Sequence, residues 1–388
     1  MLARFSTLGL AIAGSALSGP ALAAQATPAP TLPIRIAPPS GEPREWNVLA
    51  WQVSDVTCDG GIRVAPARLV APEPQLQTRI TLDADEPQTV VINFAVDAEG
   101  RAYDISSKTE PRLRLRSRDL APALRASRFA VDTPQTGCTI SYTPRLERMA
   151  EAPAETVARL GVGQRLRMPK EAWERIASGD CRNTPRVAPL TRSYPDFREL
   201  TRREGERQWT YVTYDLDAEG VPVNLAVPLT SGYAELDAAA REAVAAGRYA
   251  GGPRTGCVQA WWTGPEIVPA PPIPPKSETE GNPACEIKDR WEKEPRLTFP
   301  LNYQQRAIEG WAILRYDVAP WGDIGAIEVL AAQPSAEFGE AAVNVIRQAR
   351  FKPQESGLKG CVDRVIFRIR ADEREMQEAG AEMGAITD

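Results

Sequence analysis

Three consecutive stretches decide the fold: TYVTYDLDAEGVPVNLAV at residues 210–227, LDAAAREAVAAGRY at 236–249 and TGCVQAW at 255–261. In the first stretch, apolar and polar residues alternate before a DAEG turn, which is typical of a half-buried hairpin. In the second, Leu236, Ala240 and Val244 recur at four-residue intervals, the spacing of one helix face. The order therefore predicts two strands, a helix, and a third strand that opens near Cys257.

This pattern occurs twice more in the chain. The matching stretches are VVINFAVDAEGRAYDISS, DLAPALRASRF and TGCTISY (residues 90–107, 119–129 and 136–142), then AILRYDVAPWGDIGAIEVL, FGEAAVNVIRQARF and KGCVDRVIFRI (residues 312–330, 338–351 and 359–369). A turn glycine and the aromatic residue after the helix are 29 residues apart each time: Gly100 to Phe129, Gly220 to Tyr249 and Gly322 to Phe351. Three matched spacings with matched residue types indicate an internal repeat.

We therefore predict an α+β protein of three tandem units, each a small antiparallel sheet with one covering helix. A helix is needed because an isolated hairpin is only marginally stable. In the first unit, Asp119 is the expected N-cap, with Leu120 and Leu124 on the buried stripe. The predicted segments are a leader at 1–23, units at 44–147, 157–266 and 280–371, and a charged tail at 372–388. Proline-rich or polar composition predicts a lead at 26–43 and linkers at Glu151–Thr156 and Val268–Pro275.

Six cysteines permit 15 pairings, so the sequence alone leaves the connectivity open. Consecutive pairing gives loops of 80, 76 and 76 residues, and this near-equality favours one disulfide per unit. The predicted pairs are Cys58–Cys138, Cys181–Cys257 and Cys285–Cys361. Each pair would tie an irregular N-terminal arm to the third strand, a structural role.

The N-terminus predicts export. Arg4 precedes the apolar stretch FSTLGLAIAGSALSG, and Ala21–Ala23 forms an A-x-A cleavage signal. The alternative is an uncleaved anchor in the inner membrane. An exported chain also suits disulfides.

Composition excludes several function classes. The chain has no histidine, which removes Ser-His and Cys-His nucleophile pairs and imidazole metal sites. A net charge of −5 argues against nucleic-acid binding. We find no phosphate loop, no nucleophile elbow and no metal-ligand spacing, so we predict no catalytic residue, no metal and no small-molecule cofactor.

Other clusters have structural explanations that compete with functional ones. The alternating arginines at 112–118 could contact anionic polymer, but a solvated strand face explains them equally simply. Trp261 and Trp262 must point to opposite faces of one strand, so one belongs in the core and the other at the surface or an interface. Asp215 and Asp217 flank a turn, and we expect no acid–base catalysis there.

The units resemble the C-terminal domain of TonB, the periplasmic energy transducer, and the third unit does so most clearly. Its YQQRA at 303–307 and EGW at 309–311 resemble the family's Y-P-x-x-A and E-G-x-V lead. DVAPWG at 317–322 resembles the F-D-V-x-x-D-G turn, and RFKP at 350–353 the W-R-[FY]-x-P helix end. Gln304 stands where proline is usual, and Trp321 where aspartate is common. The first two units lack the YQQRA lead.

The resemblance implies that the last strand has an open edge, which accepts the TonB box of an outer-membrane receptor by β-augmentation. In the third unit the implied binding residues are Val362, Arg364, Val365, Ile366, Phe367 and Arg368. The alternative is that this strand is merely a covered edge. Three such edges in tandem would allow avid binding.

The function implied is a periplasmic protein that binds peptides or proteins of the envelope transport system, within TonB-dependent transport. The family's membrane helix carries a functional histidine, which this chain lacks, so a binding or adaptor role is expected rather than direct energy transduction. The expected partner is an outer-membrane TonB-dependent receptor or another envelope protein. The alternative function is a structural envelope module that contacts peptidoglycan and has no transport role.

Overall fold

A computed structural model of the protein describes residues 46–77, 89–107, 119–163, 168–181, 183 and 186–369. Several predicted segments lie outside the described residues: the leader at 1–23, the proline-rich lead at 26–43, the arginines at 112–118 and the tail at 372–388. Across the described ranges, no helix is both long enough and apolar enough to span a bilayer. The fold is mixed α+β with antiparallel sheets.

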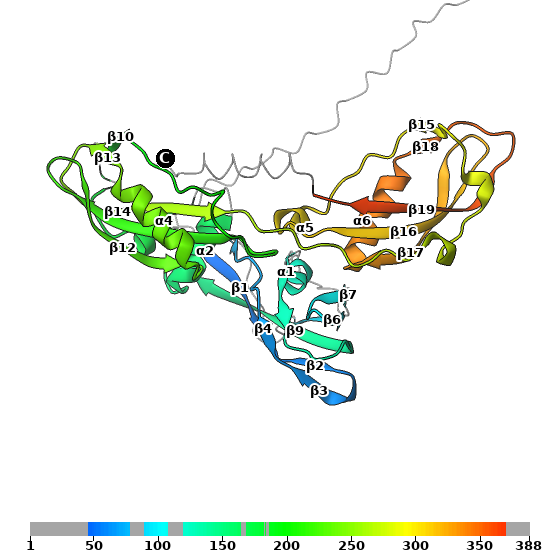
Figure 1. Ribbon diagram of the computed structural model, residues 1–388, viewed down its shortest axis with the longest axis horizontal. Helices are drawn as coiled ribbons and strands as arrows, with labels where there is room; N and C mark the ends of the chain where they lie inside the picture. Colours follow the sequence, from blue (N-terminus) through cyan, green and yellow to red (C-terminus); the bar gives the residue numbers. More distant parts are fainter. Residues whose placement is uncertain are drawn as a thin grey trace, which may run out of the picture. The chain divides into compact units, whose positions relative to one another are not determined.

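The third unit has the simplest sheet. Its three strands, β16 (Gly310–Val318), β17 (Ile324–Gln333) and β19 (Leu358–Phe367), are antiparallel in the order β17-β16-β19. Helix α6 (Ala336–Arg347) covers one face (Figure 1). Phe338, Ala342 and Ile346 recur at four-residue intervals on this helix and are fully or almost fully buried. The Phe338 ring packs edge-on against Tyr303 and Phe367. The remaining elements are η2 (Lys276–Glu278), η3 (Pro283–Cys285), β15 (Trp291–Lys293), α5 (Leu301–Gln305) and β18 (Arg350–Phe351).

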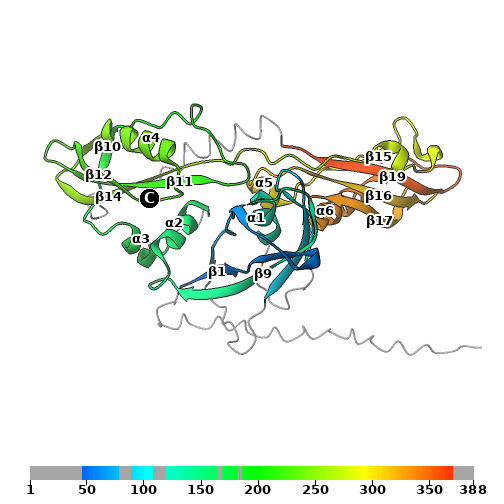
Figure 2. The ribbon, with the colours of Figure 1, turned by 60° about the horizontal axis from the view of Figure 1, so that its bottom comes forward.

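The second unit has the same sheet order with helices on both faces (Figure 2). Its elements are β10 (Ala188–Thr191), β11 (Gln208–Leu216), β12 (Pro222–Thr230), α4 (Ala234–Ala245), β13 (Arg248–Ala250) and β14 (Arg254–Thr263). Helix α4 covers the face that carries Trp261, which is 1% exposed. Helices α2 (Ala154–Gly163) and α3 (Lys170–Ile176) pack on the other face, against Trp209 and the half-buried Trp262. Trp262 is thus an interface residue, one of the two predicted placements.

The first unit has a larger sheet of seven strands, where we expected a small one. The strands are β1 (Asn47–Val53), β2 (Val56–Cys58), β3 (Ile62–Val64), β5 (Gln75–Gln77), β6 (Val90–Val96), β7 (Ala102–Ser107) and β9 (Gln135–Arg148). The other elements are η1 (Asp59–Gly61), β4 (Pro66–Arg68), α1 (Leu120–Ala126) and β8 (Arg128–Phe129). The additional strands come from the arm before β6, so this arm is not irregular.

The 29-residue spacing has a physical basis. In each unit the aromatic residue donates its backbone N–H to the carbonyl oxygen of the turn glycine: Phe129 to Gly100 (2.9 Å), Tyr249 to Gly220 (3.0 Å) and Phe351 to Gly322 (2.9 Å). The three glycines have φ of 76°, 76° and 94°, which L side chains rarely adopt. A Cβ on any of them would collide with the carbonyl of that same aromatic residue. The repeat therefore preserves a close backbone contact between turn and helix end.

Gly322→Ala should lower the free energy of unfolding of the third unit by about 1–3 kcal/mol, because alanine is strained at positive φ and its Cβ meets the Phe351 carbonyl. Denaturant titration would measure the loss. Gly325→Ala is the matched control three residues away, since its Cβ would meet no atom within 4 Å. Equal losses for the two variants would contradict the assigned turn contact.

Disulfides and short ribbons also recur in the three units. The cysteines are joined consecutively, Cys58–Cys138, Cys181–Cys257 and Cys285–Cys361, with sequence separations of 80, 76 and 76. In each unit the arm also adds a short strand to the two or three residues that follow the helix: β4 on β8, β10 on β13 and β15 on β18. Each arm is thus fastened at two points.

Both predicted linkers are packed rather than open. Ala152, in the predicted linker before the second unit, is fully buried, and α2 already begins at Ala154. Val268 is also fully buried and pairs with the chain beside Ile308. The proline-rich composition predicted an open linker, but proline carbonyls can still accept hydrogen bonds from the folded protein. The Pro271 carbonyl accepts one from Trp311 Nε1 at 2.8 Å.

Asp119 occupies the predicted N-cap position of α1, but its side chain makes no capping hydrogen bond. Its carboxylate instead accepts two hydrogen bonds of 2.6 Å from Arg306 and one of 2.6 Å from the backbone N–H of Glu73. Arg306 also donates to the carbonyl of Gly205 at 3.1 Å. One buried ion pair therefore links residues of all three units.

Candidate strand-binding edge

Strand β19 carries the predicted binding residues, and its two faces differ. Val365 and Phe367 are buried, 8% and 0% exposed, in the core beneath α6. Their side chains are therefore unavailable to a ligand. Ile366 is 40% exposed and points to the opposite face, since neighbouring strand residues alternate. Arg368 is exposed just beyond the strand end.

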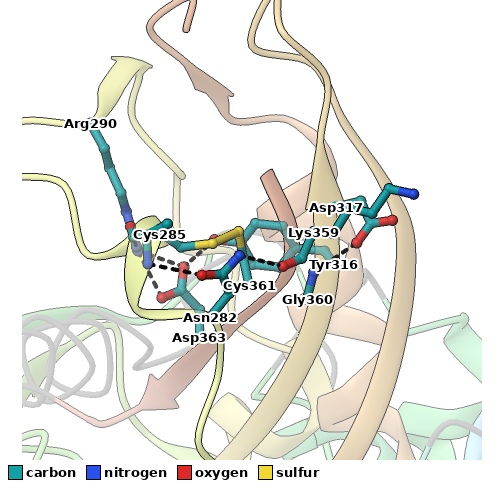
Figure 3. The surroundings of a disulfide bond; sticks show 10 residues. Asn282, Cys285, Arg290, Tyr316, Asp317, Lys359, Gly360, Cys361 and Asp363 are labelled. Carbon is teal, nitrogen blue, oxygen red and sulfur yellow. Dashed lines mark hydrogen bonds and ion pairs between the residues drawn. A yellow bond between two sulfur atoms is a disulfide. The ribbon is translucent and has the colours of Figure 1, made fainter. Parts of the chain in front are cut away.

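The start of β19 is held by the N-terminal arm of the third unit (Figure 3). Asn282 donates its backbone N–H to the Gly360 carbonyl (3.0 Å) and its side-chain amide to that of Lys359 (2.9 Å). The Cys285–Cys361 disulfide lies beside these bonds. This end of the strand edge is therefore occupied.

A partly buried polar cluster fixes the same end of the strand. Arg290 binds both carboxylate oxygens of Asp363, at 2.7 and 2.6 Å, and its guanidinium stacks on Trp291 and Phe351. The Tyr316 hydroxyl donates to Asp363 at 2.6 Å (Figure 3). Burial, together with the Asp363 charge, raises the pKa of Tyr316 well above its usual value, so the phenol stays a donor. No sequence motif reveals this cluster, because Asp363 lies 73 residues from Arg290 and 47 from Tyr316.

The backbone of β19 beyond this cluster faces outward. β16 pairs with one side, in the register Tyr316↔Cys361 and Ala312↔Val365. Within the described part of the chain, no strand pairs with the other side. The outward-facing backbone groups on this side, at Val362, Arg364 and Ile366, are named the outer edge of β19. The arm lies close to the first two: Gly281 sits against the Val362 N–H, and the Arg364 side chain donates to Thr279 at 2.8 Å.

The first unit shows which backbone groups point outward. Ser141 lies three residues after Cys138, as Arg364 does after Cys361, and both cysteines pair with the strand that precedes the turn glycine, β6 or β16. The backbone of Ser141 faces away from that strand: its carbonyl accepts from Ser54 N and its N–H donates to Ser54 Oγ, both at 2.9 Å. Residues two apart in a strand point the same way, so Val362, Arg364 and Ile366 present the equivalent groups.

The expectation of three open edges is wrong for the first unit. There β1 pairs with the outer side of β9 over seven residue pairs, from Asn47↔Arg148 to Val53↔Tyr142. β2 continues the pairing at Thr57↔Thr139. In the second unit, β14 ends the described sheet, as β19 does in the third. A covered edge and uncovered edges therefore coexist in one chain.

The paired aspartates of the second unit have structural roles. Asp215 accepts from the Asn224 amide and from Gly256 N, both at 2.9 Å, and these hydrogen bonds lower its pKa. Asp217 accepts from two backbone N–H groups of its own turn. Among the described residues there is no group of three or more acidic or cysteine side chains placed to hold a metal ion.

Three comparisons with known proteins each return a TonB sequence or structure. The family model "Gram-negative bacterial TonB protein C-terminal" matches residues 295–370. Protein TonB of Escherichia coli (strain K12) is 31% identical over 71 residues, which are 18% of this chain, and the chain covers 29% of that protein's length. A solution structure of the Pseudomonas aeruginosa TonB C-terminal domain matches with 22% identity over 21% of this chain and 86% of that one, with a TM-score of 0.19. Residues 295–370 therefore match the TonB C-terminal domain family.

Proposed function

We propose that the third unit binds an extended segment of an envelope protein, which adds as a strand to the outer edge of β19. The observation that carries this proposal is the contrast between β9, whose outer side is paired by β1, and β19, whose outer side has no strand in the described part of the chain. Free N–H and C=O groups on a sheet edge are a template for strand addition. Such binding depends on backbone groups and makes modest demands on side chains.

The family of the third unit suggests the partner. The proposed ligand is the TonB-box segment of an outer-membrane receptor, and the proposed location is the periplasm, reached through cleavage of the predicted leader. The protein would then act as a binding or adaptor component of TonB-dependent transport. Its three disulfides are compatible with an oxidising compartment.

The tandem organisation is part of the same proposal. We infer that residues 44–147 and 157–266 are divergent copies of the domain at 280–371. The recurring glycine–aromatic hydrogen bond, the consecutive disulfides and the recurring ribbon beside each helix support this. The copies differ mainly in what covers the outer side of the last strand.

Charge at the edge favours an acidic ligand. Arg364 lies half-buried in β19 and Arg368 is exposed just beyond it, whereas the strand's one acid, Asp363, is held by Arg290. An extended segment with an acidic residue near Arg368 would gain a charge pair at the solvent-exposed rim. Such a pair contributes about 0–1 kcal/mol, so it tunes the choice of ligand rather than supplying the affinity.

Ile366→Pro tests the proposal, because proline removes the outward N–H at the C-terminal end of the edge, where the arm does not reach. Binding of a synthetic TonB-box peptide, measured by calorimetry, should weaken at least about tenfold, the loss expected from one hydrogen bond left unmade. Ile366→Ala keeps the N–H and is the matched control. It should bind within about threefold of the unchanged protein, since the lost contact is half exposed.

Hydrogen exchange locates the bound peptide. The amides of Val362, Arg364 and Ile366 should become protected when the peptide is added, and those of β17 should not. Binding without this protection, or equal weakening by both Ile366 variants, contradicts strand addition at β19. Sedimentation with isolated peptidoglycan and no peptide binding would instead favour the structural envelope role.

A further inference from the structure

We propose that the outer side of β9 in the first unit is a second strand-accepting edge, filled by the chain's own strand β1. This goes beyond the proposed binding at β19, and its test does not depend on a receptor peptide. The ligand of this edge is an internal segment, residues 46–55, and an external strand can reach it only when β1 leaves.

The first step is the equivalence of the two edges. β9 pairs with β6 in the register Phe94↔Cys138, as β19 pairs with β16 in the register Tyr316↔Cys361. A glycine with positive φ precedes each cysteine, Gly137 at 59° and Gly360 at 69°. The outer backbone groups of the two strands therefore correspond residue by residue.

The second step is the way β1 lies on this edge. It runs antiparallel to β9, and the Ser54 backbone N–H donates to the Ser141 carbonyl at 2.9 Å. Alternation along the ladder places the next inter-strand hydrogen bonds at Gln52↔Thr143 and Ala50↔Arg145. β1 thus takes the position that an added strand would take.

The third step is that side chains hold β1 more firmly than a backbone ladder alone would. Val48 and Leu49 are both 0% exposed, and Val48 packs with the cluster that contains Trp173 and Trp209. Trp51 packs against the core of the first unit. An external strand would have to replace these apolar contacts, so β1 excludes competitors from β9 in the resting protein.

Gln52 gives a clean way to weaken this strand. Its side chain is exposed, so a substitution there leaves the core unchanged. Gln52→Pro removes the N–H that faces Thr143, whereas Gln52→Ala keeps it. Exchange at the Thr143 amide should rise by about tenfold or more in Gln52→Pro, because the loss of one ladder hydrogen bond loosens β1, and should change little in Gln52→Ala.

The decisive measurement is strand complementation in the full chain. A synthetic peptide of residues 46–55 should bind Gln52→Pro and restore protection at Ser141 and Thr143. It should not bind at β9 in the unchanged protein or in Gln52→Ala. Peptide protection of these β9 amides in the unchanged protein, or a folded Gln52→Pro variant that takes up no peptide, would overturn the proposal.

A second measurement keeps the test valid if Gln52→Pro does not fold. In the unchanged protein, the amides of β9 that face β1 should be among the slowest to exchange in the first unit, with no peptide present. The outward amides of β19, at Val362, Arg364 and Ile366, should exchange faster than their β9 equivalents by at least about a hundredfold. Equal exchange at the two edges would show that β1 does not fill β9.

Discussion

Arg306→Met should lower the free energy of unfolding by about 3–5 kcal/mol, the largest loss expected from any single charged residue in the described part of the chain. The Arg306 and Asp119 side chains are only 6% and 13% exposed. Methionine would leave the Asp119 carboxylate buried with one backbone donor, the Glu73 N–H, and no compensating cation. Guanidinium titration, or the shift in melting temperature, would measure the loss.

The electrostatic environment of Arg306 explains the expected size. Burial alone lowers the pKa of Arg306, but the charge and hydrogen bonds of Asp119 outweigh it and raise the pKa above its usual value. The guanidinium is therefore charged at any relevant pH, and the pair is formed at full charge. Its bidentate geometry makes it stronger than a single charged contact.

Two further variants test whether the expected loss comes from the burial of the ion pair. Arg315→Met removes the partner of Glu328 in the same unit, but those side chains are 48% and 63% exposed, so the loss should be about 0–1 kcal/mol. The double variant Arg306→Met/Asp119→Asn removes both charges while keeping an acceptor for Glu73, and it should recover most of the loss. If the double variant is as unstable as Arg306→Met, the charge left on Asp119 is not the cause.

The hairpin, helix and third strand of each predicted unit could be predicted because their sequence signals are local. Alternation around each turn and the four-residue spacing of Phe338, Ala342 and Ile346 follow from the geometry of single elements. The glycine–aromatic spacing was visible because one backbone hydrogen bond fixes it at 29 residues in each unit. Local signals of this kind need no knowledge of distant partners.

The features that could not be predicted from the sequence depend on contacts between residues far apart in the chain. The arm stretch NVLAWQV at 47–53 forms β1, but its partner on β9 lies about 95 residues away and has no counterpart in the other units. The covered edge of the first unit was therefore invisible, and three open edges were expected. Asp119 had the local signature of an N-cap, yet an arginine 187 residues away takes its carboxylate.

The candidate edge was only partly predictable for a similar reason. The family motif located β19, but it could not say which of its side chains are available. Val365 and Phe367 are buried beneath α6, so among the predicted residues only the alternate positions present side chains outside the core. The cluster of Arg290, Asp363 and Tyr316, which anchors the strand, has no sequence signature.

Removing the Cys285–Cys361 disulfide, as Cys285→Ala/Cys361→Ala, should destabilise the third unit by about 4–5 kcal/mol by the chain-entropy estimate for a loop of 76 residues. Unfolding of a chain with several units need not be two-state, so the loss should be read from hydrogen exchange of amides in β16 and β19. Cys181→Ala/Cys257→Ala is the matched control, with the same separation of 76. It should accelerate exchange in β11 and β14 instead.

The result also distinguishes two ways of holding the arm. If the disulfide is the main fastening, exchange at Val365 should accelerate strongly, because the arm that carries Arg290 loses its covalent tie beside Asp363. If exchange there is unchanged, the Arg290–Asp363 pair and the Asn282 hydrogen bonds hold the arm unaided. In the first case the Lys359 and Gly360 carbonyls become free as the arm detaches. The outer edge of β19 then lengthens toward its start, and a longer peptide should bind the reduced protein more tightly than the oxidised one.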